Sequence, residues 1–264
     1  MNTAALRVHV EAALASRFPA PFALRPREVE TVSAGISEID SLAGGLPRGG
    51  LTEILGAPCS GRTSFLLALL ATLTARAEFC ALVDARDALD PHSAEAAGVE
   101  LRRLLWVRCR DIEQALRATD LLLQGGGFGL VALDLSDIPA QTVRRVPLNA
   151  WFRFRRGVEN TPTVLILLEQ EPSAKTCASL VLRVTAEAAH WSAKEGSSVR
   201  HAHTRLLRGM QIHAELLRSR PAHPAETASS ARFSVGTRLA GTAEILSGIR
   251  AARERIGKVK EPKP

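Results

Sequence analysis

The stretch 53-EILGAPCSGRTSFLLALL-70 decides the fold of this chain. A short apolar strand runs into a glycine-containing loop, and the loop opens an apolar helix. The pattern Gly56-x-x-x-x-Gly61-Arg62-Thr63 is typical of a phosphate-binding loop, in which backbone N–H groups and a helix N-terminus face an anion. The alternative is a strand–turn–helix that needs the glycines only for its backbone. The position of the pattern between a strand and a helix favours the phosphate loop.

One residue of this loop differs from the usual pattern, because Arg62 stands where a lysine is expected. The guanidinium keeps the positive charge, but it is a planar fork and not a compact ammonium. Thr63 has the hydroxyl position that would hold Mg²⁺. We therefore expect nucleotide binding to tolerate the change better than γ-phosphate transfer does.

The composition indicates a globular α/β protein with a sizeable core. Of the 264 residues, 46% are hydrophobic and 23% are charged, which allows one large domain with extensions or two small domains. The net charge of +7 favours acidic or polyanionic partners. Aromatic residues make up only 4%, so extended base-stacking surfaces are not expected. No signal peptide or apolar span is recognisable, and the expected location is the cytoplasm.

The chain divides into three expected parts. Residues 1–26 form an amphipathic helix and a proline-rich linker, residues 27–220 form the core domain, and residues 221–264 form a flexible basic C-terminal region. Short apolar runs alternate with helical patterns in the core, which predicts a mostly parallel sheet flanked by helices. Alternating apolar residues in 180–184 and 210–216 predict an antiparallel extension of this sheet.

The core helices and strands are predicted from local signals. Asp111 caps a helix that Gly125 to Gly127 end, and Pro147 bends or restarts the helix expected over 141–158. After the first strand, the expected strands cover residues 79–85, 104–109, 130–136 and 163–170.

Polar residues follow several of these strands. Asp84, Asp134 and Gln170 lie at strand ends, as the phosphate loop does. Because ligands of open parallel sheets bind outside the carboxyl ends of the strands, we expect these groups to converge on one site.

Several segments resemble the RecA recombinase core. The run 33-SAGISEIDSLAGGLPRGGLTEILGAPCSGRTS-64, followed by 82-LVDARDALDP-91, is similar to that family, and 130-LVALDLS-136 and 163-TVLILLEQ-170 continue the match in order. The resemblance covers residues 30–185 and implies a RecA-type ATPase fold.

This resemblance also implies a site for ATP with Mg²⁺. Asp134 would be the acid on the Mg²⁺ side, together with Thr63, and Gln170 would sense the γ-phosphate. The implied nucleotide-binding residues are Gly56, Ser60, Gly61, Arg62, Thr63, Ser64, Asp134 and Gln170.

Several residues differ from the RecA family pattern at positions that serve ATP binding and hydrolysis. Arg86 stands where the family has the glutamate that activates water, and an arginine stays protonated and cannot act as a base. Asp87 is adjacent, but its side chain is expected to point elsewhere. Ser93 replaces the adenine-stacking tyrosine, and Glu169 replaces an asparagine. No catalytic residue is therefore predicted.

The departures concern DNA binding as well. The two loops with which RecA proteins grip single-stranded DNA are shortened, one after Ser136 and one within residues 171–178. A short, degenerate RecA-like chain of this kind, with the segment 206-LLRGMQIHAELLRSR-220, resembles the ImuA family. That resemblance implies an accessory role in damage-induced mutagenesis (translesion DNA synthesis) at the nucleoid. The implied partners are an ImuB-like inactive Y-family polymerase, RecA, and DNA through the basic C-terminal region.

Two alternatives stay open. The first is a weak DNA-stimulated ATPase of recombinational repair, and the second is a cell-division inhibitor, because the family is distantly similar to SulA. Two basic stretches are also ambiguous. Residues 151-WFRFRR-156 fit a helix with aromatic residues in the core better than a nucleic-acid surface. Residues 200-RHAHTRLLR-208 suit DNA contacts and a charged edge strand equally.

Overall fold

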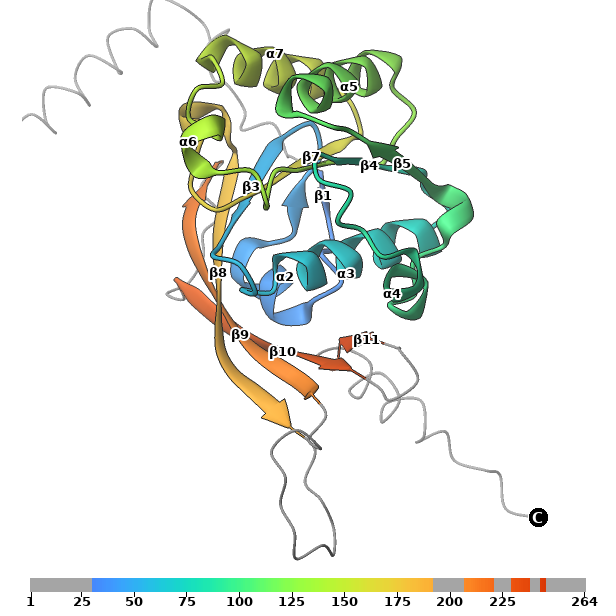
Figure 1. Cartoon of the computed structure of the whole chain (residues 1–264), viewed down its shortest axis with the longest axis vertical. Coiled ribbons are helices and arrows are strands. Elements are labelled where there is room, and N and C mark those ends of the chain that lie inside the picture. The colour runs from blue at the N-terminus through green and yellow to red at the C-terminus, as the bar shows by residue number, and fades with distance from the viewer. Residues whose placement is uncertain (1–29, 192–206, 221–228, 238–242, 246–264) are drawn as a thin grey trace, which may run out of the picture.

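A computed structural model describes residues 30–191, 207–220, 229–237 and 243–245 of the chain. Its main element is a nine-stranded sheet in the order β11-β10-β9-β8-β3-β7-β6-β4-β5 (Figure 1). The parallel part consists of six strands. These are β3 (Leu51–Leu55), β4 (Cys80–Asp84), β5 (Leu104–Arg108), β6 (Leu130–Asp134), β7 (Val164–Glu169) and β8 (Leu180–Trp191). A separate pair joins β1 (Thr31–Val32) to β2 (Leu46–Pro47).

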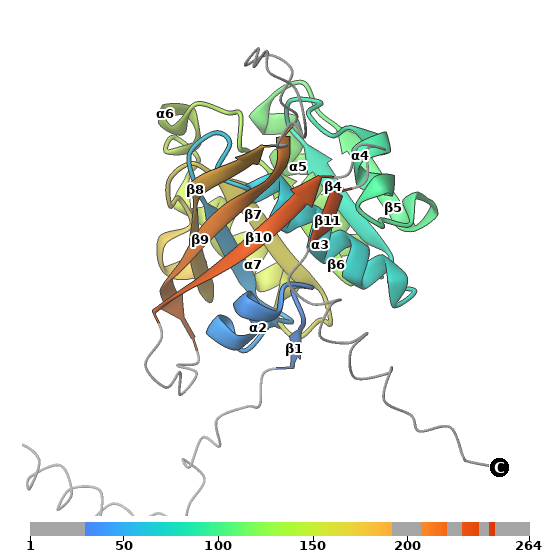
Figure 2. The same ribbon diagram turned by 90° about the horizontal axis from the view of Figure 1, so that it is seen from below.

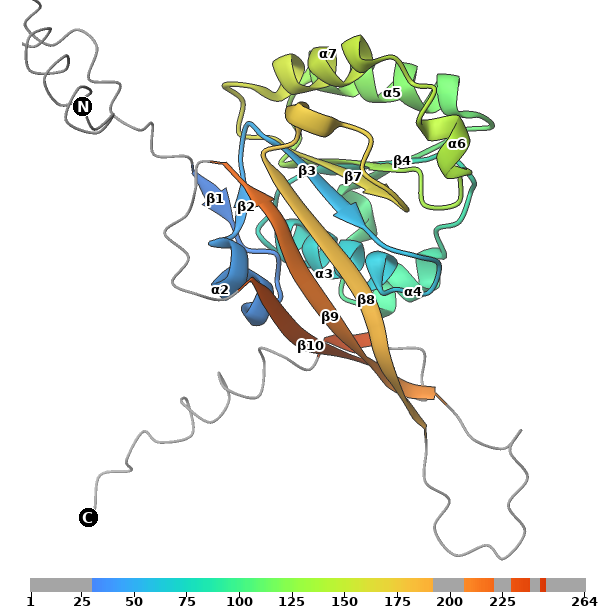
Figure 3. The same cartoon turned by 90° about the vertical axis from the view of Figure 1, so that its left-hand side faces the viewer.

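Helices cover both faces of the sheet, so the fold is the predicted α/β arrangement. The helices α2 (Ser37–Ala43), α3 (Arg62–Ala75) and α4 (Pro91–Ala96) lie on one face, and α5 (Ile112–Gly125) and α7 (Leu148–Val158) lie on the other (Figures 1 and 3). The short α6 (Ala140–Val143) precedes α7. None of the described helices is long and apolar enough to cross a bilayer.

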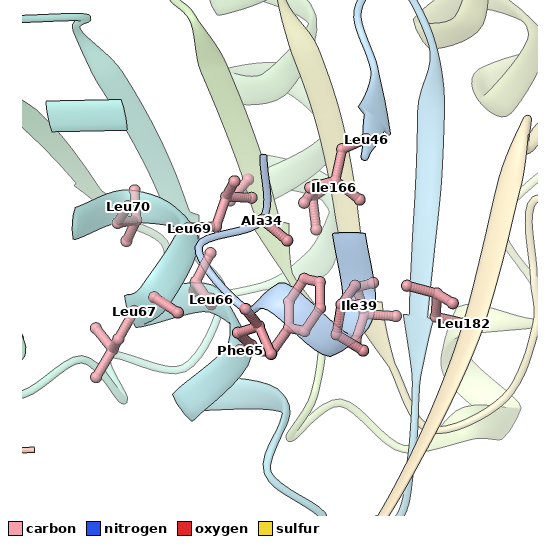
Figure 4. Packing of buried hydrophobic residues seen from close by; sticks show 14 of the residues in the cluster. Ala34, Ile39, Leu46, Phe65, Leu66, Leu67, Leu69, Leu70, Ile166 and Leu182 are labelled. Atoms are coloured by element: carbon pink, nitrogen blue, oxygen red, sulfur yellow. The ribbon is translucent and has the colours of Figure 1, made fainter. Parts of the chain in front are cut away.

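Each face of the sheet carries its own apolar core. On the α3 face, Phe65 and Ile39 pack with Leu182 and Ile166 from the sheet (Figure 4). On the α5–α7 face, Trp151 and Phe154 are almost completely buried. Strands buried on both faces explain the nearly continuous apolar runs from which the parallel sheet was predicted.

The local signals for helix ends are confirmed. The Asp111 carboxylate accepts a hydrogen bond from the Gln114 amide at 2.8 Å, and Gly126 has a φ of 65° where α5 ends. Pro147 is the N-cap residue of α7, so the helical segment expected over 141–158 restarts there as predicted. Of the residues in 151–156, Trp151 and Phe154 are buried and the three arginines are exposed, which confirms the packing interpretation.

The antiparallel extension is longer than the sequence indicated. The predicted strands belong to β8 and to β9 (Leu207–Ser219), and β10 (Ser230–Thr237) and β11 (Ala243–Ile245) continue the sheet (Figure 2). These last two strands fall in the region that was expected to be flexible, so the sheet extends beyond residue 220. The reason is that Phe233 and Val235 of β10 are buried in the α3-side core.

Several expectations concern segments outside the described residues. These are the N-terminal helix and linker (1–26), the loop 192–203, the basic stretch before Leu207, and the last ten residues.

Candidate nucleotide site

The phosphate loop connects β3 to α3, as predicted. Its residues 57–59 are exposed, and its backbone takes the left-handed conformation twice, at Cys59 (φ 61°) and Gly61 (φ 99°). Such alternation turns successive N–H groups toward one concave face, where an anion can bind. The Gly56 amide donates to the Glu169 carbonyl at 3.1 Å, which joins the start of the loop to the end of β7.

Both glycines of the loop are required by close neighbours. A Cβ at Gly56 would lie 2.3 Å from Ser60 Oγ and 2.6 Å from the Val184 carbonyl oxygen. A Cβ at Gly61 would lie 2.2 Å from Cδ1 of Ile212. Strands β8 and β9 therefore pack directly against the loop. This contact could not be predicted from the sequence, because β9 follows the loop by about 150 positions and reaches it only through its place in the sheet beside β8.

Arg62 is buried at the start of α3 and only 5% exposed. Burial lowers the pKa of its guanidinium, against the opposing charges of Asp134 and Asp137. Its Nη1 is buried and finds no hydrogen-bond partner among the described residues. A buried cationic donor without an acceptor fits an anionic group such as a phosphate.

The remaining predicted ligands differ in their exposure and hydrogen bonding. Thr63 is exposed and Ser64 is half-buried, whereas Ser60 is buried and its Oγ has no described partner. Asp134 Oδ1 accepts the Ser136 amide at 2.8 Å, and Gln170 Nε2 donates to the Ser136 carbonyl at 3.0 Å.

Asp134 and Gln170 are thus brought together through Ser136, which the sequence did not single out. Burial raises the pKa of Asp134, partly offset by its hydrogen bonds from Ser136 and by the charge of Arg62. An accessible hydroxyl on Thr63, a carboxylate on Asp134 and an orphan donor on Arg62 are compatible with ATP and Mg²⁺.

Asp84 lies at the predicted edge, but both oxygens of its carboxylate accept hydrogen bonds from the turn after β4 and from β5. It accepts the backbone amides of Arg86, Ala88 and Leu89 at 3.0, 2.8 and 3.0 Å, and Trp106 Nε1 at 3.1 Å. Burial alone would raise the pKa of Asp84, but these hydrogen bonds outweigh it and lower the pKa. Asp84 therefore shapes the turn after β4 and is not free to bind a ligand.

Neither Arg86, which occupies the position of the missing base, nor the adjacent Asp87 is arranged to activate water. Arg86 is exposed, and no ion pair of its guanidinium is found within residues 30–191. Asp87 is held by Arg108 of β5, whose Nε lies 2.6 Å from Asp87 Oδ1. This ion pair supports the expectation that Asp87 does not replace the family's glutamate.

Two buried carboxyl groups, Glu53 and Glu169, lie behind the loop on the α5–α7 face. Glu53 Oε1 accepts the amides of Ser173 and Ala174 at 2.9 and 2.7 Å, which holds the segment after β7. Glu169 is 1% exposed, and neither of its oxygens has a described hydrogen-bond partner. Burial raises the pKa of Glu169 well above its ordinary value, and the neighbouring Glu53 adds to this rise, whereas Ser173 opposes it. The acidic residues inside apolar strands were the available signal for this pair.

The comparisons with known proteins agree with this geometry. Residues 23–144 match the family model of the RecA N-terminal domain. Protein RecA of Rhizobium rhizogenes is 40% identical over 109 residues, which is 40% of this chain and 30% of that protein. Protein RecA of Allorhizobium ampelinum is 41% identical and that of Brucella canis 40% identical, over the same lengths and shares.

The matched stretch spans 30% of the length of these curated relatives. The family-model match, residues 23–144, contains the phosphate loop, Asp84 and Asp134, and it ends before β7. The mostly parallel sheet and the loop between β3 and α3 agree with these matches, which make residues 23–144 similar to the RecA N-terminal domain.

Proposed function

We propose that this chain is a RecA-like accessory protein of damage-induced mutagenesis, which serves as an adaptor in translesion DNA synthesis. In this role it binds a polymerase-like partner of the ImuB kind and RecA or DNA. Nucleotide, where it binds, is a structural or switching ligand. The observation that carries the proposal is a phosphate loop retained beside a missing base, since Arg86 is exposed and Asp87 is paired with Arg108.

The loop supports binding more than turnover. Arg62 offers an unpaired buried donor, and Asp134 and Gln170 remain at the edge of the sheet. Hydrolysis needs in addition a carboxylate that takes a proton from water, within hydrogen-bond reach of it. In the turn after β4, Asp84 accepts four hydrogen bonds and Asp87 is paired with Arg108, so neither of these two carboxylates is free for that task.

The first test measures ATP binding and hydrolysis by the purified chain, with and without single-stranded DNA. We expect binding without DNA-stimulated turnover. Turnover that disappears in Asp134→Ala would overturn the adaptor proposal and favour the weak DNA-stimulated ATPase. Binding that disappears in Asp134→Ala without any turnover in the parent chain supports the ligand role.

The second test concerns partners. We assign partner contacts to the N-terminal residues 1–25 and to the basic C-terminal residues 240–264, since their composition suits docking and polyanions. Pull-downs with an ImuB-like polymerase and with RecA, repeated after deletion of each segment, check this assignment. Unchanged capture of both proteins by the doubly truncated chain would remove it.

A further inference from the structure

A small pocket with a mixed polar and aliphatic lining lies on the α5–α7 side, beside the segment that follows β7. It has a volume of about 300 Å³ and an aliphatic lining from Val143, Val146, Leu148 and Pro172. These residues come from α6, the turn after it, the start of α7 and the segment after β7. Leu148 is 38% exposed, so part of this apolar lining faces solvent.

The rim of the pocket is basic. Arg144 and Lys175 line it, and Arg145 follows Arg144 in the chain. Arg144 is paired with Glu171, but no ion pair of Arg145 or Lys175 is found among the described residues. Arg218 of β9 donates to the Lys175 carbonyl, which brings another cation to this side.

We propose that this pocket, which we call the α6–α7 pocket, docks an acidic peptide of a partner protein through one large apolar side chain. The inference rests on the proposed adaptor function and names the surface that would carry it. The volume lies at the lower limit of small-molecule sites, so it suits one anchoring side chain better than a cofactor. Anchors of this kind, in a pocket from which water is excluded, dominate the affinity of many interfaces.

The charge of the rim selects the flanking residues of the peptide. The exposed cations Arg144, Arg145 and Lys175 outnumber the exposed acid Glu171 here, so aspartate and glutamate on both sides of the anchor are complementary. The net charge of the whole chain has the same sign and would steer such a segment toward it.

The lining favours a peptide over single-stranded nucleic acid. Bases bind through stacking on exposed aromatic rings. The one aromatic residue that lines this pocket, Trp151, is 1% exposed, and it packs edge-to-face against Phe154 with ring centroids 5.9 Å apart. The pocket therefore offers aliphatic side chains to an anchoring residue, but no exposed aromatic ring on which a base could stack.

The proposal is tested by selecting a displayed library of random twelve-residue peptides on the full-length chain. We expect enriched peptides with one Phe, Leu, Ile or Trp flanked by Asp or Glu. Their affinity should fall at least about tenfold in Leu148→Asp, as for an interface hot spot, and also in Lys175→Glu. Leu148 is the first residue of α7, where an acidic side chain suits the helix N-terminus, so this variant is expected to fold.

Matched controls are Leu121→Asp and Arg117→Glu on α5, since Leu121 is 68% exposed and Arg117 belongs to an exposed ion pair. The inference is overturned when no such motif is enriched, or when the pocket variants and control variants bind the peptides equally. The inference is also overturned when a 25-nucleotide oligothymidine displaces the peptides, or when Leu148→Asp weakens binding of this oligonucleotide. Either result would show that the surface binds nucleic acid.

Pull-down of the polymerase-like partner separates this inference from the proposed function. Unchanged capture by Leu148→Asp leaves the adaptor role standing and removes the pocket from it. Acidic peptides that depend on Leu148, combined with no capture of the polymerase-like protein or RecA by the parent chain, would instead overturn the proposed function and retain the pocket.

Discussion

Ile212 of β9 packs against Gly61 of the phosphate loop, with its Cδ1 2.2 Å from the place where a Cβ of residue 61 would lie. We predict that Gly61→Ala destabilises the protein through this contact and through its φ of 99°. The matched control is Gly126→Ala, which has a φ of 65° but open space around its Cβ.

The free energy of unfolding should fall by about 1–2 kcal/mol in Gly126→Ala, which is the cost of a left-handed alanine. In Gly61→Ala it should fall by about 1–3 kcal/mol more because of overpacking. Urea unfolding followed by circular dichroism measures both. Ile212→Val removes Cδ1 and should restore part of the difference in the double variant. Equal losses in the two alanine variants, or no rescue, would show that the contact has no energetic weight.

A second prediction concerns the buried Glu169. Because its pKa is raised in the folded protein, the folded state keeps the proton while the unfolded chain ionises above pH 4.5. This carboxyl group therefore costs stability increasingly as the pH rises from 4.5 toward its folded pKa. Glu169→Gln cannot ionise, so the variant should gain stability over the parent as the pH rises above 4.5.

Urea unfolding of Glu169→Gln between pH 4.5 and pH 8 provides the measurement. Glu159→Gln at the exposed end of α7 serves as the control and should follow the parent curve. Stability profiles for Glu169→Gln and the parent that run parallel throughout this range would contradict a shifted pKa at this site.

A third prediction concerns Asp84, which holds the turn after β4. Asp84→Asn replaces one of the two acceptor oxygens by an NH2 group, which then faces at least one of the present donors, so the variant should lose about 1–3 kcal/mol of stability. Because its pKa is lowered in the folded state, this stabilisation is present above pH 3.8 and is lost as the pH falls through the folded pKa.

Thermal unfolding between pH 2 and pH 7 checks this dependence, and Asp84→Asn should flatten its acid limb. The matched control is Asp87→Asn, which breaks an exposed ion pair with Arg108 and should cost at most about 1 kcal/mol. An Asp84 variant as stable as the Asp87 variant would show that the turn does not depend on these hydrogen bonds.

A fourth prediction uses the unpaired donor of Arg62. Pyrophosphate should raise the melting temperature of the parent chain, by the equivalent of about 1.4 kcal/mol at ten times its dissociation constant. Arg62→Met should abolish this rise, and Arg86→Met, at an exposed site, should retain it. Differential scanning calorimetry measures the shifts, and a rise that survives in Arg62→Met would place the anion elsewhere.

Much of the fold follows from local patterns in the sequence. The parallel strands are predicted because their sequences are nearly continuous apolar runs. The ends of α5 and the start of α7 are predicted because single residues, such as Asp111 and Pro147, determine them. The position of Asp134 and Gln170 at one edge follows from the parallel arrangement, without any knowledge of contacts.

The features that the sequence did not reveal depend on partners far along the chain. Strand β10 was missed because Phe233 and Val235 lie among small polar residues and are buried only through pairing with β9. The burial of Arg62 and the engagement of Asp84 by Trp106 arise from packing between elements, and no spacing rule encodes them.

Strand β9 joins two regions that differ in exposure. Leu207 at one end is 45% exposed, and Ile212, five residues later, is buried against Gly61. An extended strand covers that interval in about 17 Å. A displacement of β9 would therefore reach the phosphate loop where Ile212 contacts Gly61, so the packing of this strand and the conformation of the loop are coupled.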